Sequence, residues 1–189
     1  LEYQYIKRPE MLERLLQALA LQIGQEVSYT ELANLLKIDK ITVEKYIGLL
    51  EQSFIIFRLP AFSRNLRKEI GKARKIYFFD LGIRNSLIKN FNTLSLRSDV
   101  GHLWENFLVV ERLKANSHAG RDVNNYFWRT YDQKEVDYIE EYGGVLDGYE
   151  FKLDGEDKFK IPKVFLDNYK ESSVKLINKN NYLPFVGVK

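Results

Sequence analysis

Three residues of this chain have the types and the spacing to do metal-assisted chemistry. Asp137 stands in the run Glu135–Ile139, and Glu150 and Lys152 stand two residues apart in the run Val145–Lys152. Because side chains alternate along a strand, Glu150 and Lys152 share one face. If the two runs pair as a hairpin, Asp137 comes beside Glu150. Two carboxylates next to an ammonium group form a hard oxygen site that suits Mg²⁺, with Asp137 and Glu150 as its ligands.

Such a site can hydrolyse a phosphodiester. A bound divalent cation polarises the phosphoryl group and lowers the pKa of an attacking water. Lys152 is then the residue that orients this water or helps to deprotonate it, and Glu105 can supply a third carboxylate. The alternative is a solvated sheet face, where acid–lysine pairs are common and contribute little to stability.

Other catalytic chemistries have little to draw on. The chain has no cysteine, so it can form neither a disulfide nor a thiolate metal site. His102 and His118 are its only histidines, which gives a histidine metal site or a Ser-His-Asp triad few candidates.

The elements that must position the candidate residues follow an α-β-β-β-α-β order within residues 98–189. The predicted elements are a helix at Val100–Ala115, strands at Tyr126–Arg129, Glu135–Ile139 and Val145–Lys152, a helix at about Lys158–Tyr169 and a strand at Val174–Ile177. Gly143-Gly144 supplies the turn between the second and third strands. In the first helix, Glu105 falls on the border of the apolar face and Glu111 close to its middle. The order predicts an α/β fold, a mixed sheet with helices packed on it.

Residues 1–97 predict a winged helix. The predicted elements are a helix at Met11–Ile23, a helix capped by Thr30, a third helix opened by Asp39 or Thr42, and strands at Phe54–Leu59 and Lys75–Phe79. The second and third helices are joined by a tight turn and form a helix-turn-helix, and the two strands form a hairpin. Asp80 is expected to cap a further short helix.

The segment between the two predicted strands is basic. Its cations, set against the single acid Glu69, are Arg64, Arg67, Lys68, Lys72, Arg74 and Lys75. A basic wing beside a recognition helix can contact nucleic-acid phosphates. Winged helices also dock proteins, and basic loops are often only solvated. Residues 1–97 carry 16 basic and 10 acidic side chains, whereas residues 98–189 carry 13 and 16.

Composition indicates a globular protein. Of the 189 residues, 45% are hydrophobic and 29% are charged, a balance that does not favour disorder. No apolar run reaches the roughly 18 residues of a membrane span, and no membrane partner is expected. The absence of cysteine fits a reducing compartment, so we expect a soluble, cytoplasmic protein.

The candidate residues carry a resemblance to a known superfamily. Gly101-x-x-x-Glu105, Glu135-Val136-Asp137-Tyr138-Ile139 and Glu150-Phe151-Lys152, on their α-β-β-β-α-β order, resemble the PD-(D/E)xK nucleases from Ser98 to about Ile177. The resemblance implies a restriction-endonuclease-like domain in which Asp137 and Glu150 bind the metal. It also implies that Lys152 assists the water and that Glu105 completes the site. Val136 stands where the superfamily name has proline.

A longer resemblance covers nearly the whole chain. Lys75-Ile76-Tyr77-Phe78-Phe79-Asp80-Leu81-Gly82, the Gly101–Phe107 run and the Glu-Val-Asp and Glu-x-Lys pairs are similar to the C-terminal region of predicted bacterial AAA-type ATPases, a domain of unknown function. The resemblance implies that an ATPase domain precedes this region and is missing here. No phosphate-binding Gly-x-x-x-x-Gly-Lys-[Ser/Thr] motif occurs, so we expect no ATP hydrolysis and no ATP site in the chain itself.

Two functional hypotheses remain open at this point. In the first, the chain is a nucleic-acid-binding module of an AAA-type ATPase with a Mg²⁺-dependent phosphodiesterase site. In the second, the nuclease-like fold is degenerate and acts as a protein-interaction or regulatory module. A free-standing transcription regulator is less favoured, because the predicted recognition helix is weakly basic and the back half is large.

Overall fold

The computed structural model describes residues 8–63, 74–130, 132, 134–154 and 162–188, and it is a mixed α+β structure. Residue contacts divide the chain into two compact units. The first holds the described residues of Leu1–Arg58 and Ala73–Thr93, and the second those of Leu59–Lys72 and Leu94–Lys189. The predicted domain boundary between residues 97 and 98 stays a prediction. Among the described helices, none has the length and apolar character to cross a membrane.

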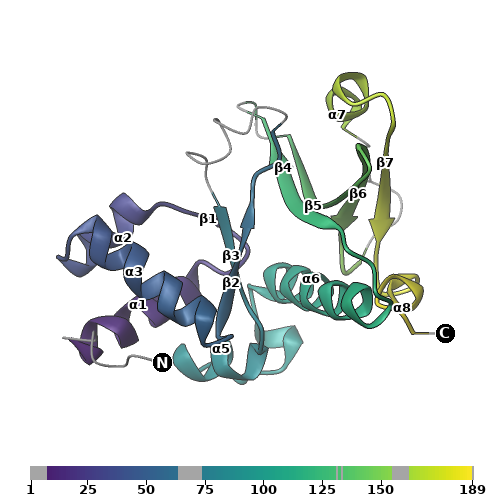
Figure 1. Ribbon diagram of the computed structural model, residues 1–189. Coiled ribbons are helices and arrows are strands. Elements are labelled where there is room, and N and C mark those ends of the chain that lie inside the picture. Colours follow the sequence, from purple (N-terminus) through teal and green to yellow (C-terminus); the bar gives the residue numbers. More distant parts are fainter. Residues whose placement is uncertain (1–7, 64–73, 131, 133, 155–161, 189) are drawn as a thin grey trace. The chain divides into compact units, whose positions relative to one another are not determined.

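The first unit alternates helices with a small sheet (Figure 1). Its elements are α1 (Pro9–Leu21), β1 (Glu26–Val27), α2 (Tyr29–Leu36), α3 (Lys40–Gln52), β2 (Ile56–Pro60), β3 (Arg74–Phe78) and α5 (Leu81–Leu87). The strand order is β1-β3-β2, and β1 runs antiparallel to β3. A core that includes Leu15, Leu19, Ile47 and Ile76 joins the helices to this sheet.

Side-chain caps fix where three of these helices begin. Asp39 Oδ1 accepts a 2.8 Å hydrogen bond from the Thr42 N–H, so Asp39 is the N-cap of α3. Asp80 caps α5 in the same way, accepting from Ile83 N at 2.9 Å, which confirms its predicted role. The predicted cap of α2 is wrong. Ser28, not Thr30, accepts from the Glu31 N–H, because α2 begins at Tyr29, one residue before Thr30.

The second unit confirms the predicted α-β-β-β-α-β order. Its elements are a 3₁₀ turn at Leu94–Leu96, α6 (Val100–His118), β4 (Asn124–Arg129), β5 (Glu135–Tyr142), β6 (Val145–Phe151), α7 (Lys163–Asn168), β7 (Ser172–Ile177) and α8 (Tyr182–Phe185). The strand order is β4-β5-β6-β7; the β4/β5 and β5/β6 pairs are antiparallel and the β6/β7 pair is parallel. The predicted mixed sheet is thereby confirmed. The predicted helix start at Lys158 lies outside the described residues.

Both faces of the four-stranded sheet carry apolar side chains. Val136, Ile139 and Leu146 pack with Phe165 of α7 on one face. Tyr138 is adjacent to Ile139 and therefore points to the opposite face. There its ring lies 6.1 Å from Tyr149, which in turn contacts Phe185 of α8 (ring centroids 4.8 Å apart). Helix α8 lies beside α6 (Figure 1).

The hairpin between β5 and β6 turns where the sequence predicts it. Gly143 and Gly144 have φ of 59° and 86°, the left-handed region that a two-residue hairpin turn requires and that glycine adopts without strain. The turn sets the register in which Tyr138 opposes Tyr149. That register brings the Asp137 and Glu150 ends of the two strands together.

We predict that Gly148→Ala destabilises the second unit by about 1–3 kcal/mol, the usual cost of overpacking a core. A Cβ at Gly148 would lie 3.0 Å from Val136 Cγ1 and 3.1 Å from the Ser173 carbonyl oxygen, and the backbone atom cannot move aside cheaply. Urea unfolding measures the effect. Gly101→Ala is the control, because its Cβ would meet nothing within 4 Å. Equal midpoints for the two variants would contradict the prediction.

Candidate metal and phosphodiester site

A β-bulge places Asp137. Along β4, Tyr126 and Trp128 are two residues apart, but their partners on β5, Ile139 and Val136, are three apart. Strand β5 therefore carries one extra residue in the stretch that contains Asp137. Bulges of this kind re-aim side chains and are frequent next to active sites. A prediction that assumes strict alternation of side chains along the strand does not include the extra residue of this bulge.

The Asp137 carboxylate reaches the neighbouring strand. Its Oδ2 accepts a 2.8 Å hydrogen bond from the backbone N–H of Phe151 on β6. Phe151 stands between Glu150 and Lys152, so this bond anchors Asp137 next to both residues. The structure thus brings together the two carboxylates and the lysine that the sequence singled out.

Glu150 is the most electrostatically perturbed group of this site. Its side chain is 16% exposed, and Oε1 pairs with Lys152 Nζ at 3.0 Å. Oε2 is buried, with no hydrogen-bond partner in the described part of the chain. Burial, followed by the neighbouring negative charge of Asp137, raises the pKa of Glu150 to about 7. Near neutral pH this carboxyl group is therefore close to half protonated.

Lys152 lies among several carboxylates. Burial alone would lower the pKa of its ammonium group, but the charges of Glu150, Asp137 and Glu105 raise it above its ordinary value. The Lys152 side chain is 53% exposed, so the ammonium can also reach solvent. Glu105 on α6 is one of the charges that act on Lys152, and its predicted role as a third carboxylate of the site stays a prediction.

The predicted orientation of α6 is wrong for its two acids. Glu105 is buried, with 8% exposure, whereas Glu111 is partly exposed and pairs with Lys114 at 2.7 Å. The apolar residues of α6 alone predict a buried face that is centred near Glu111. In the structure the buried side of α6 also includes Asn106 and Asn116, and these polar residues shift it toward Glu105.

Glu135 is a further acidic neighbour of this site. It stands two residues before Asp137, and its charge adds to those that raise the pKa of Glu150. The Arg129 guanidinium on β4 lies 3.8 Å from Glu135 Oε2. The signal was present in the sequence, because an acid two residues away on the same strand is at the right spacing to share a face.

A divalent cation between Asp137 and Glu150 would have two carboxylates as ligands. Among the described residues, no three Asp, Glu, His or Cys side chains lie close enough together to hold a metal ion. Mg²⁺ is nevertheless often bound through one or two carboxylates, with waters completing its shell. The buried Glu150 Oε2 and the mutual repulsion of Glu150 and Asp137 are what a cation between them would relieve.

The predicted nucleic-acid contacts fall mostly outside the described part of the chain. Arg64, Arg67, Lys68 and Lys72 lie outside the described residues. The other two cations have places within the fold. The Arg74 guanidinium lies 4.8 Å from the centre of the Tyr29 ring, and Lys75 is buried at 3% exposure, opposite Glu26 in the β1/β3 ladder.

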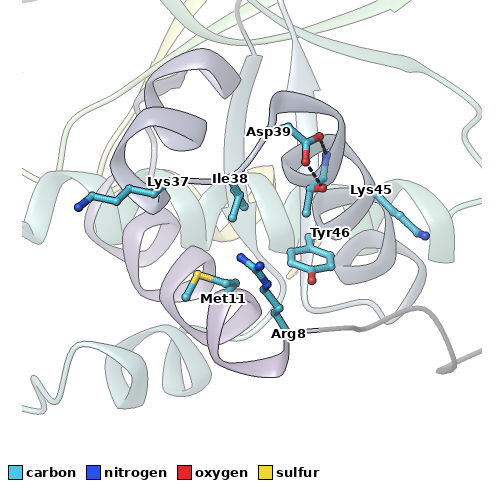
Figure 2. Close-up of a pocket in the computed structure, with 8 residues that line it drawn as sticks. Arg8, Met11, Lys37, Ile38, Asp39, Lys45 and Tyr46 are labelled. Carbon is cyan, nitrogen blue, oxygen red and sulfur yellow. Dashed lines mark hydrogen bonds between the residues drawn. The ribbon is translucent and has the colours of Figure 1, made fainter.

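A pocket of about 600 Å³ opens in the first unit where the start of α1 faces the α2–α3 turn. Figure 2 shows Arg8 directed between Met11 and Tyr46, while Lys37 and Lys45 extend away from one another. Ligand pockets usually bring a few polar groups to convergence. Since the lysines diverge here, we assign no ligand to this pocket.

Two domain families match this chain. DUF8612, a domain of unknown function, matches residues 1–94. DUF4143, a domain of unknown function found in AAA-ATPase-associated proteins, matches residues 100–184. No solved structure matches the chain significantly.

Two mycobacterial proteins, both named as uncharacterized, are similar to this chain. They are Mb2031c of Mycobacterium bovis and Rv2008c of Mycobacterium tuberculosis. Each is 31% identical over 131 residues, which is 68% of this chain and 29% of the relative. The chain thus spans less than a third of the length of these relatives.

We predict that Glu150→Gln stabilises the protein at pH 8 and has little effect near pH 4.5. The folded-state pKa of Glu150, about 7, lies above its ordinary value of 4.5, so ionisation opposes folding increasingly as pH rises through this window. Removing the charge should gain about 1–3 kcal/mol at pH 8, measured by thermal unfolding across pH.

Glu141→Gln is the matched control on the same strand pair. Hydrogen bonds from Asn124 and from the Gly144 N–H hold the pKa of Glu141 below its ordinary value, which gives its pH effect the opposite sign. This variant should gain no stability at pH 8. A Glu150→Gln effect that does not change between pH 4.5 and pH 8 would show that Glu150 titrates normally.

Proposed function

We propose that the second unit contains a Mg²⁺-dependent phosphodiesterase site of the PD-(D/E)xK kind and that the first unit is a winged helix that contacts nucleic acid. The observation that carries the proposal is the grouping of Asp137, Glu150 and Lys152 at one end of the β5/β6 pair. The helix and strand order around that pair supports it, because it matches the order that the superfamily resemblance implies.

Each residue of the site has a role that its surroundings support. Asp137 and Glu150 would hold the metal, which, when bound, activates a water and stabilises charge on the phosphate. Lys152 is half-exposed and reaches Glu150 at 3.0 Å, and its raised pKa keeps it an ammonium, so on leaving that carboxylate it can donate a hydrogen bond that orients a water beside the site. Glu105 would complete the negative rim from α6.

The topology of the first unit supports the winged-helix part of the proposal. The order α1-β1-α2-α3-β2-β3, with β1 paired to β3, gives a helix-turn-helix followed by the two longer strands of the sheet. The segment between β2 and β3, whose described start (61–63) is grouped with the second unit, carries the basic residues Arg64, Arg67, Lys68 and Lys72 in its sequence. Lys75 does not belong to the proposed phosphate-contacting set, because it is buried.

The longer relatives support a larger context. Because the chain covers 29% of each mycobacterial relative, and DUF4143 occurs in AAA-ATPase-associated proteins, we propose that it works next to an ATPase domain that it does not itself contain. ATP would then act on the nuclease-like unit only through that neighbour.

A second candidate function is a non-catalytic protein-interaction or regulatory module. The observation in its favour is that, among the described residues, no third ligand joins Asp137 and Glu150 at metal-binding distance. In this reading the pair of Glu150 with Lys152 at 3.0 Å is a structural ion pair and no cation enters.

Titration calorimetry with Mn²⁺ and Mg²⁺ separates the two candidates. We expect the wild-type chain to bind either cation, with affinity that rises from pH 6 to pH 8 because Glu150 must lose its proton. Asp137→Ala should lose at least about tenfold in affinity. Asp147→Ala is the control: Asp147 Oδ1 accepts a 2.7 Å hydrogen bond from the Ser173 hydroxyl and, because it is three positions from Glu150, its side chain points to the other face of β6. Equal affinity of both variants would argue against the assigned ligands.

Cleavage assays test Lys152. With Mn²⁺ and fluorescent single-stranded and duplex DNA and RNA, Lys152→Gln should lower the cleavage rate about 10²–10⁴-fold, the usual contribution of a positioned acid–base group. Its metal affinity should not fall, because the residue is no ligand. Metal binding without cleavage of any of these substrates by the wild-type chain would favour the regulatory module.

A further inference from the structure

A buried salt bridge ties three elements of the second unit together. The Arg112 guanidinium on α6 donates two parallel hydrogen bonds to Glu140 on β5, Nε to Oε1 at 2.7 Å and Nη2 to Oε2 at 2.8 Å. Its Nη1 donates to the carbonyl oxygen of Phe185 on α8 at 2.7 Å. The guanidinium carbon also lies 4.8 Å from the centre of the Phe185 ring. We call Arg112 and Glu140 the clamp.

The clamp is geometrically demanding. The Glu140 side chain is only 2% exposed, and Asn116, one helical turn after Arg112, donates to its Oε1. Arg121 reaches Glu140 Oε2 at 3.4 Å. Each oxygen of this carboxylate thus has donors in fixed directions, and a planar guanidinium fork meets a carboxylate in one orientation.

Helix α6 presents Glu105 on the same side as the clamp. Seven and eleven residues separate Glu105 from Arg112 and Asn116, and at 100° per residue these spacings return to within about 20° of the same direction. All three side chains are buried or nearly so, with Glu105 at 8% exposure. A slip of α6 by one turn would carry Glu105 about 5.4 Å along the helix axis.

Strand β5 carries one residue of the clamp and one residue of the candidate metal site. Glu140 accepts the clamp, and Asp137 of the candidate site stands three residues earlier, on the far side of Tyr138 and within the bulged stretch. The same helix and the same strand therefore carry the clamp and two of the candidate carboxylates. Fixing α6 on β5 at the clamp fixes how Glu105 lies relative to Asp137.

We infer that Arg112 and Glu140 are positioning residues that set the rotation and register of α6, so that Glu105 faces the Asp137, Glu150 and Lys152 group. The inference rests on the proposed function for its catalytic meaning. Nothing in the clamp itself touches the reacting atoms.

The first test is a double-mutant cycle on Mn²⁺ affinity. Arg112→Lys keeps the charge but loses the fork, and Glu105→Gln removes the positioned carboxylate. Each should weaken Mn²⁺ binding about threefold to tenfold, and the double variant should be no weaker than the weaker single variant, because both changes remove one interaction. Effects that multiply in the double variant would overturn the inference.

A destabilised control excludes a general loss of folding. Phe165→Leu, in the core of α7 on the other face of the sheet, should lower the melting temperature without changing Mn²⁺ affinity. If it weakens Mn²⁺ binding as much as Arg112→Lys does at equal loss of stability, the positioning role is refuted. Glu140→Gln provides a second clamp variant should Arg112→Lys fail to fold.

A second readout does not depend on metal binding. The chain has no cysteine, so Glu105→Cys introduces a single thiol at the position in question. In the clamped protein this thiol should react slowly with a disulfide reagent, and adding Arg112→Lys should accelerate it at least tenfold. Equal rates would overturn the inference whatever Mn²⁺ does. Acceleration in a protein that binds no Mn²⁺ would sustain the positioning role and refute the proposed phosphodiesterase.

Discussion

One buried carboxylate constrains how the second unit packs. Glu140 is 2% exposed, and an ionised carboxylate left unpaired inside a protein costs several kcal/mol. Burial alone would raise the pKa of Glu140, but hydrogen bonds from Arg112 and Asn116 hold it below the ordinary value, so the group stays charged. Apolar contacts alone are non-directional and would tolerate several placements of α6. The carboxylate accepts only the placement that delivers Arg112 and Asn116 to it.

The two buried glutamates of the β5/β6 hairpin have opposite environments. Glu140 on β5 has its full set of donors, whereas Glu150 on β6 has a buried oxygen with no donor in the described part of the chain and a pKa raised to about 7. A carboxylate whose oxygens all accept hydrogen bonds, such as Glu140, stabilises the packing of the elements around it. An unsaturated one next to a second acid raises the energy of the folded state unless a cation or a proton joins it, and such perturbed pairs cluster at functional sites.

The contrast also explains what sequence could and could not predict. Hydrophobic periodicity found the α-β-β-β-α-β order, and short-range capping chemistry found Asp80 and narrowed the start of α3 to Asp39 or Thr42, because each of those signals lies within a few residues. The bulge on β5 and the buried side of α6 escaped. Both features depend on partners that lie far along the chain; Arg112 and Glu140, for example, are 28 residues apart. A pattern that counts every polar residue as exposed therefore predicts a buried face of α6 that does not include Glu105.

The ion pair between Lys152 and Glu150 does not by itself decide between a catalytic and a degenerate site. With Lys152 53% exposed, a pair of this kind contributes about 0–1 kcal/mol, so a divalent cation can displace the ammonium at small cost. The larger free-energy cost of binding a cation is the ionisation of Glu150, whose pKa is raised to about 7. A cation shared with Asp137 would favour that ionisation. In the proposed phosphodiesterase, further negative charge held close to this pair would favour the cation over the ammonium. That depends on where α6 presents Glu105, and so on the packing that Glu140 imposes.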